Sequence, residues 1–380
     1  MAETANETTE PGGTAPTPPG AGPLALVAGF VAFVHVLWWV LGDSVVSFGN
    51  LYDGDGFIRL VRIERLLETG QWFDSSLPRA NWPYGGSLHW TRPFDVVVIA
   101  LALPLAPVLG MGKALFWSGA AIGPLLHVLA AVALAWAARP LIGRAGALIA
   151  GALTAVQFGI LGYAIVGHAD HHVLIGLIVV IAFGFAVRAL RADEGGERHA
   201  LGAGIVLAAG YWVGLETQVT AGLFFLIFGL KWLAEGDETG ERALRLITRL
   251  ALGLAGGLVA AVLMERGAQG FFDPQYDRIS IVQLTLVGMV ALFWWGVSAA
   301  QGRGWALATV PARFAAAALG GGAALGVMGA AFPRYFTNPL KDFDPLILKV
   351  FEGVAEYTPI QDVPHFLIYA GVAIIAGPWV

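Results

Sequence analysis

Two short segments carry most of the residues in this chain that could do chemistry. The first is Asp53-Gly54-Asp55-Gly56, which follows the first long apolar run, and the second is Asp170-His171-His172. Two carboxylates one residue apart suit a hard divalent cation, whereas imidazoles beside a carboxylate favour Mn²⁺ over Mg²⁺. For the first segment the alternative is a helix cap, in which Asp53 or Asp55 accepts backbone N–H groups. For the second the alternative is a polar helix end exposed to water.

The sequence around these segments has the composition of a membrane protein. Of its 380 residues, 57% are hydrophobic and 13% are charged, whereas about a quarter of the residues of a soluble domain are charged. The absence of cysteine excludes disulfides, thiolate zinc sites and a cysteine nucleophile. We therefore expect an all-α polytopic membrane protein, with the lipid bilayer as a partner and no nucleic acid.

Apolar runs of roughly 20 residues predict about ten transmembrane helices within a domain that covers residues 23–380. The expected helices lie near 24–43, 114–137, 145–165, 173–190, 199–216, 218–234, 247–264, 280–299, 311–331 and 366–380. Residues 1–22 contain no Lys or Arg and are rich in Pro, Gly and Thr, which predicts a disordered tail.

The segments between these runs predict the topology. Residues 94–110 are apolar but short and interrupted by Pro104 and Pro107, so we expect a re-entrant or interfacial segment. If that segment does not cross, the basic residues of four short loops fall on the side of the N-terminus, as the positive-inside rule requires. These residues are Arg139, Arg144, Arg188, Arg191, Arg198, Lys231, Arg242, Arg245, Arg249, Arg303 and Arg313. The long loops 43–93 and 332–363 then lie on the opposite, non-cytoplasmic side together with Asp170.

Three arginines follow the first acidic segment at a spacing of three residues. Arg59, Arg62 and Arg65 would form one stripe on a helix. Such a stripe can neutralise an anionic lipid or a donor phosphate, or it can simply face the lipid headgroups.

The order of the motifs resembles that of a known family. Trp72-Phe73-Asp74, Pro83-Tyr84-Gly85 and His89-Trp90 follow the first acidic segment; Asp170-His171-His172-Val173 comes next, and Val354-Ala355-Glu356 precedes Pro359. This order resembles the catalytic subunit of archaeal and bacterial oligosaccharyltransferases, over about residues 24–365. The resemblance implies the glycosyltransferase-C fold. It also implies a metal-dependent transfer of a glycan from a polyprenyl-phosphate-linked donor to protein asparagine, on the periplasmic or external face of a prokaryotic inner membrane.

The resemblance also implies roles for individual residues. Asp55 and Glu356 match catalytic positions, and together with Asp170 and His172 they match the ligands of Mn²⁺ or Mg²⁺. His171 and His89 match positions suited to the phosphates of the donor. Asp53 and Arg59 are candidates for a supporting role behind these residues.

Two departures from the family's pattern leave alternatives open. Tyr163 stands seven residues before Asp170, where the family usually has an arginine. The Trp-Trp-Asp motif of the family's soluble C-terminal domain is absent, and the last apolar run reaches Val380 without a polar flank, so we expect a fragment without that domain. The alternative function is a transferase that uses a polyprenyl-phosphate sugar to modify a lipid or polysaccharide. A transporter or flippase is a third interpretation, which intramembrane charges at helix midpoints and internal repeats would favour.

Overall fold

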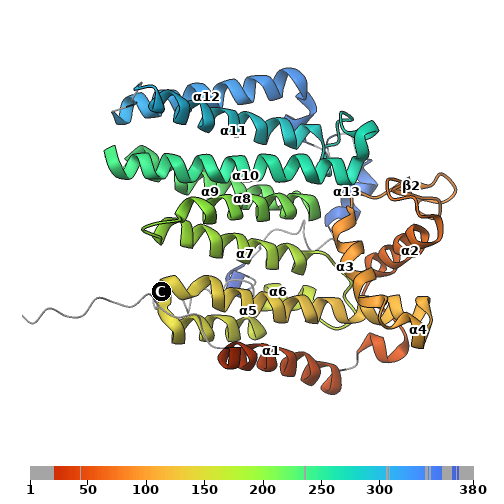
Figure 1. Ribbon diagram of the computed structural model, residues 1–380. Coiled ribbons are helices and arrows are strands. Elements are labelled where there is room, and N and C mark those ends of the chain that lie inside the picture. The colour runs from red at the N-terminus through yellow and green to blue at the C-terminus, as the bar shows by residue number, and fades with distance from the viewer. Residues whose placement is uncertain are drawn as a thin grey trace, which may run out of the picture.

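The structure is a computed structural model, and it is almost entirely helical. It describes residues 21–42, 44–234, 237–304, 307, 309–338, 341, 344–352, 362–364 and 366–367. Long helices stack side by side, and α2, α3 and α4 gather at one end of the stack (Figure 1). Glu356 and most of the expected helix at 366–380 lie outside the described residues.

Eight long helices form the body of the part of the chain that the structure describes. They are α1 (Ala21–Leu41), α5 (Met111–Leu153), α7 (His172–Arg191), α8 (Gly196–Val213), α9 (Thr217–Ala234), α10 (Asp237–Gly270), α11 (Ile281–Gly302) and α12 (Val310–Ala331). All of these except α8 are long and apolar enough to cross a membrane. The prediction of an all-α polytopic membrane protein is therefore confirmed.

Shorter elements connect the long helices. They are η1 (Val45–Phe48), α2 (Gly54–Thr69), β1 (Ser76–Leu77), β2 (Gly86–Ser87), α3 (Arg92–Ala102), α4 (Ala106–Leu109), η2 (Thr154–Val156), α6 (Phe158–Ala164), η3 (Pro333–Phe336) and α13 (Pro345–Glu352). Strands β1 and β2 pair antiparallel, with Ser76 opposite Ser87. Helices α3 and α4 have only 11 and 4 residues, too few to cross a bilayer. The segment 94–110 therefore does not cross the membrane as one helix, as expected.

Helix α5 is two helices joined at a reversal. Gly143 has φ 71° and ψ −174°, which is not helical. Beyond it the chain returns along the first part, so that Nε2 of His127 donates to the carbonyl of Thr154 at 3.1 Å. The structure thus contains both helices predicted near 114–137 and 145–165, with the second ending at Leu153.

The largest apolar core lies between α8 and α10 and extends to α9 and α11. Leu207, Leu250, Phe224 and Phe228 are buried there. The backbones of α8 and α10 approach so closely that a Cβ atom on Gly204 would clash with the carbonyl oxygen of Leu250. Close packing through small residues is the usual way in which helices associate in lipid.

Helix α1 packs mainly against α5 and contributes one buried polar side chain. Nε2 of His35 lies 2.9 Å from Nδ1 of His127, and the two residues are 4% and 0% exposed. Since Nε2 of His127 donates to Thr154, its Nδ1 accepts the hydrogen bond from His35. The pair satisfies two imidazoles within an otherwise apolar interface.

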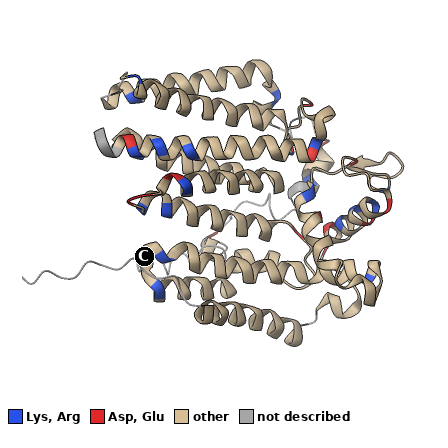
Figure 2. Cartoon of the chain, in the orientation of Figure 1, with Lys and Arg blue, Asp and Glu red and all other residues tan. Residues whose placement is uncertain are grey.

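Lys and Arg lie at both ends of the bundle, and those of the four short loops lie at the end opposite α2, α3 and α4 (Figure 2). At that end Arg188 donates to the carbonyl of Trp136 at 2.7 Å, and Arg313 donates to that of Trp232 at 2.7 Å. Arg245 and Arg249 both pair with Glu197, at 3.2 and 3.0 Å. The basic loops therefore share one end of the bundle, as the topology predicted, and the acidic segments lie at the other.

Candidate active site

Helix α2 begins at the first acidic segment. Asp53 has extended backbone, and its side chain accepts from the amide of Gly56 at 2.8 Å. The helix cap considered for this segment is therefore correct for Asp53. Asp55 lies in the first turn of α2 and is exposed.

The arginines of α2 face the protein interior. Arg59 and Arg62 are 1% and 3% exposed, so the headgroup-facing alternative is wrong for both. Arg59 lies 3.5 Å from Asp170, and Arg62 lies 3.1 Å from Asp95. Arg65, which is half-buried, forms an ion pair with Asp74 at 2.8 Å.

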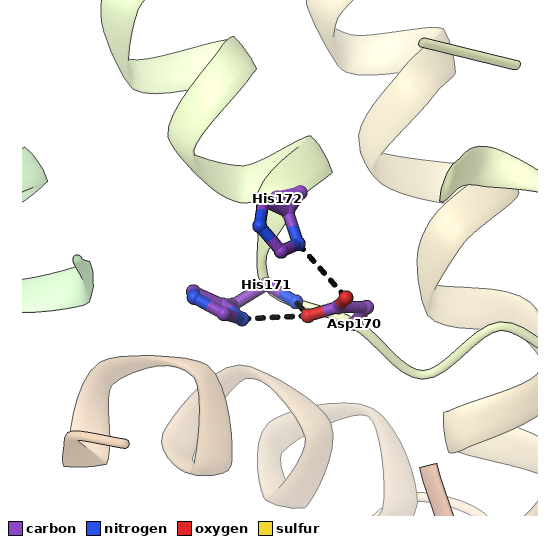
Figure 3. Close-up of side chains that lie close together, drawn as sticks. All are labelled: Asp170, His171 and His172. Atoms are coloured by element: carbon purple, nitrogen blue, oxygen red, sulfur yellow. Dashed lines mark hydrogen bonds and ion pairs between the residues drawn. The ribbon is translucent and has the colours of Figure 1, made fainter. Parts of the chain in front are cut away.

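Asp170, His171 and His172 form a compact cluster at the start of α7. Nδ1 of His171 lies 2.6 Å from Oδ1 of Asp170, and Nδ1 of His172 lies 2.8 Å from Oδ2 (Figure 3). The three side chains each offer a ligand atom, and these atoms lie within 4.8 Å of one another. Asp170 and His171 are buried, which excludes the alternative of a fully solvated helix end.

Arg59 completes this cluster from the side of α2. Its Nη2 atom lies 3.0 Å from Nδ1 of His171. Its guanidinium lies over the rings of Trp90 and Phe94, at 4.1 and 4.7 Å from their centroids. These contacts fix a positive charge beside the carboxylate, where a flexible lysine could not make the same planar contacts.

Neighbouring groups shift the pKa values of Asp170 and His171. Burial raises the pKa of the Asp170 carboxyl, but hydrogen bonds from His171 and His172 lower it by more, so the net pKa lies below its usual range. Burial lowers the pKa of His171, and the nearby Arg59 charge acts in the same direction. An ionised carboxylate beside a neutral imidazole is the state in which both groups bind metal.

The donor set fits a divalent cation. One carboxylate and two imidazoles suit Mn²⁺ or Zn²⁺ better than Mg²⁺, which prefers oxygen ligands. Asp170 and His172, both predicted as ligands, are together, and His171 is the third member of the group. Asp55 lies outside this group, and Glu356 lies outside the described residues.

His168 also belongs to the site, although its sequence context did not predict this. Its Nε2 atom lies 2.9 Å from Oδ2 of Asp53 and 3.9 Å from Oδ2 of Asp170. Its ring lies close to those of Tyr52 and Tyr163, with centroid distances of 5.3 and 5.5 Å. The signal that could have found it is its place two residues before Asp170 in a segment with few other polar residues.

Tyr163 contacts two histidines of the site. Its ring stacks on that of His168 and lies 4.7 Å from that of His172. An aromatic ring therefore occupies the position at which the resemblance implies an arginine.

A cavity adjoins the cluster on the side of His171. Its walls include His89, Trp90, Glu216, Asp277 and Arg278. The second ring nitrogen of His171 points away from Asp170 (Figure 3), and His171 also lines this cavity. His89 and His171, both predicted to face phosphates, thus share one cavity.

A buried network holds the first long loop against the bundle. Asp95 is 0% exposed and lies 3.1 Å from Arg62 and 3.2 Å from Arg92. Glu265 of α10 accepts from the backbone of Arg92 at 3.0 Å and from the indole of Trp212 at 2.7 Å. These contacts fix the start of α3, and through Arg62 they fix α2.

Comparison with solved structures finds the same arrangement of helices in an archaeal enzyme. The oligosaccharyltransferase of Archaeoglobus fulgidus in complex with zinc and sulfate matches with a TM-score of 0.65 and 19% identity, over 94% of this chain and 46% of that one. The oligosaccharyltransferase AglB from the same organism, in complex with an inhibitory peptide and a dolichol-phosphate, matches with a TM-score of 0.66 and 19% identity, over 88% of this chain and 39% of that one. A third structure, tethered to an acceptor peptide with the NVT sequon, matches with a TM-score of 0.65 and 16% identity, over 94% and 46%.

This chain has the fold of those oligosaccharyltransferases. It spans less than half the length of the solved chains that it matches. No family model and no curated protein sequence matches it. The glycosyltransferase-C-like helical fold predicted from the motif order is confirmed, and the chain is that of an integral membrane protein.

Proposed function

We propose that this protein is a membrane glycosyltransferase of the oligosaccharyltransferase type. It would transfer a glycan from a polyprenyl-phosphate-linked donor to protein asparagine with the help of Mn²⁺ or Mg²⁺. The observation that supports this most is the cluster of Asp170, His171 and His172 in a bundle with the fold of these enzymes. The solved relatives carry zinc, a dolichol-phosphate or an acceptor peptide, which fits a donor and an acceptor of these classes.

We place the site on the periplasmic or external face of a prokaryotic inner membrane. The end of the bundle opposite α2, α3 and α4 carries the basic loops (Figure 2). By the positive-inside rule that end is cytoplasmic, which puts Asp170 on the other side.

The residues of the site have distinct roles in this proposal. Asp170 and His172 would hold the cation, and its chemistry is Lewis-acid stabilisation of a leaving phosphate. Asp55 and Glu356 would complete the ligand set, with Asp55 orienting the acceptor amide. Arg59 would hold the carboxylate of Asp170 in place through their ion pair at 3.5 Å. His89 and His171 would face the donor phosphates from the cavity that they share.

One observation favours a second candidate, a transferase that modifies a lipid or polysaccharide. Tyr163 places an aromatic ring on His168 and His172, where the resemblance implies a basic contact. Such a change fits a donor or an acceptor of another shape.

A transfer assay separates the candidates. Purified protein would be given Mn²⁺, a labelled polyprenyl-linked glycan and a peptide that contains Asn-x-Thr, beside the variants Asp55→Ala and Asp170→Ala. We expect a labelled peptide with the unchanged protein and none with either variant. Transfer without metal, or full activity in both variants, would remove the site assignment. Label in lipid or polysaccharide but not in peptide would establish the second candidate.

A further inference from the structure

His168 joins the two acidic segments, which are far apart in the chain. Its Nε2 atom lies within 4 Å of both Asp53 and Asp170, at 2.9 and 3.9 Å. Asp53 in turn uses its other oxygen to cap α2, through Gly56. His168 therefore stands between the carboxylate that starts α2 and the carboxylate of the metal-ligand cluster.

The surroundings of His168 fix it in this position. The residue is 6% exposed, and the rings of Tyr52 and Tyr163 both pack against its imidazole. The backbone amide of Tyr52 donates to the carbonyl of Gly167 at 2.8 Å, so the segments that carry Asp53 and His168 are also paired through their backbones.

The geometry excludes His168 as a metal ligand in this arrangement. Its Nδ1 atom lies 3.1 Å from the carbonyl of Gly162, and its Nε2 atom lies 2.9 Å from the carboxylate of Asp53. Both ring nitrogens are therefore engaged with oxygen atoms outside the cluster of Asp170, His171 and His172, so neither is directed at a cation bound there.

We propose that His168 is a positioning residue that holds the start of α2, and with it Asp55, in a fixed place relative to Asp170. It acts through Asp53, and it touches neither substrate nor cation. The inference concerns residues of the proposed transferase site, but its structural part does not depend on that function.

Two conservative substitutions separate the two hydrogen bonds of His168. The amide nitrogen of glutamine reaches about as far as Nε2 of histidine, so His168→Gln keeps the bond to Asp53 and loses the one to Gly162. The shorter asparagine reaches about as far as Nδ1, so His168→Asn does the reverse. Both variants remove the imidazole and its packing on the tyrosines, which makes them a matched pair.

Mn²⁺ binding to the full chain in detergent, followed by electron paramagnetic resonance of the free ion, is the first readout. Residues that orient a metal site from behind typically change affinity 10- to 100-fold. We expect His168→Asn to weaken binding about 10-fold and His168→Gln to stay within about threefold of the unchanged protein. Equal affinities for the two variants, whether both weak or both unchanged, would overturn the proposal.

Asp53→Asn tests the other end of the same contact. Asparagine caps helices as well as aspartate does, so α2 keeps its start while the charged partner of His168 is lost. We expect the same weakening as in His168→Asn, and no further loss when the two are combined, because both remove one interaction. Additive losses would contradict this. His199→Gln, in the first part of α8 at the other end of the bundle, is the control for loss of a histidine.

Amide hydrogen exchange without metal is the second readout, and it is independent of the proposed function. In His168→Asn, the amides of residues 54–58 should exchange at least several-fold faster, whereas His168→Gln should match the unchanged protein. Failure of the unchanged protein to bind Mn²⁺ would count against the proposed function, and the exchange rates would still decide the role of His168. Unaltered exchange in His168→Asn would overturn that role.

Discussion

Arg59 and Arg62 lie one turn apart on α2 and form two buried ion pairs that differ in what surrounds the carboxylate. Asp170, the partner of Arg59, is also contacted by His171 and His172 and is 12% exposed at its side chain. Asp95, the partner of Arg62, is completely buried and shared with Arg92. A ligand can reach the first carboxylate, whereas the second has no open side.

The difference shows that a buried ion pair does not by itself identify a functional site. Breaking a buried pair leaves a charge without compensation and is strongly destabilising. A substitution of Asp95 should therefore affect only the stability of the fold, since two arginines pair with this one carboxylate. At Asp170 the proposed metal site would give the same kind of carboxylate a second role, and the substitutions below separate the two roles.

Asp95→Asn tests the structural pair and should have the largest effect. It leaves Arg62 and Arg92 buried without the carboxylate that they share, at a cost of about 3–5 kcal/mol in the free energy of unfolding. Unfolding in mixed micelles with increasing SDS would measure it. The control is Asp273→Asn, whose carboxylate is 68% exposed. Equal stability of the two variants would mean that the network around Asp95 adds nothing.

Asp170→Asn tests the other carboxylate. Mutation of a residue that only orients a metal ligand typically lowers metal affinity 10- to 100-fold. Removal of a ligand itself should lower it more, so we expect the Mn²⁺ affinity to fall about 100-fold or more. Titration with Mn²⁺ would measure the change. The control is the same titration of the Asp95→Asn protein that remains folded. The distinction between the two pairs fails if Asp95→Asn loses Mn²⁺ binding as strongly as Asp170→Asn does.

Arg59→Lys keeps the charge of the first pair and removes its planar contacts. Lysine cannot lie over Trp90 and Phe94 and reach His171 in the same way, so Asp170 and His171 lose part of their support. We expect about a 10-fold loss of transfer rate. Arg65→Lys is the matched control, because its pair with Asp74 is partly exposed. Unchanged transfer in Arg59→Lys would show that its charge alone suffices.

Asp74→Asn should have the smallest effect. Hydrogen bonds from Ser76 and then Arg65 lower the pKa of Asp74 to about 2, from 3.8. Because the folded-state pKa is the lower one, the stabilisation is complete above about pH 4 and is lost as the pH falls through about 2. The pair is partly exposed, so we expect less than about 1 kcal/mol. Unfolding at several pH values would measure the difference between the variant and the unchanged protein, which should be constant from pH 5 to 8 and vanish near pH 2.

Much of the fold could be predicted from the sequence, because apolar runs and loop charges act over whole segments. The reversal at Gly143 fell between two predicted helices, and the basic loops lie at one end of the bundle. Asp170 and His172 were predicted because their neighbours in the sequence are also their neighbours in space.

The remaining parts of the site depend on contacts between distant residues. The spacing of Arg59 and Arg62 predicted a shared face but not that it points inward, since the partners Asp170 and Asp95 lie far along the chain. The link between His168 and Asp53 spans more than 100 residues, and nothing in either segment alone indicates it. The roles of all the site residues, Asp170 and His172 as well as Asp55 and Glu356, stay predictions.

The hydrogen bond between His35 and His127 has a consequence for biosynthesis. The two residues are 92 positions apart, so α1 is made well before the helix that carries its partner. Its imidazole must then be tolerated by lipid, by water or by the insertion machinery until α5 arrives. The high mean hydropathy of α1, 2.3, gives it enough affinity for the bilayer to remain inserted until α5 is made. We therefore expect α1 to insert on its own and to settle into its final place only when α5 has entered the membrane.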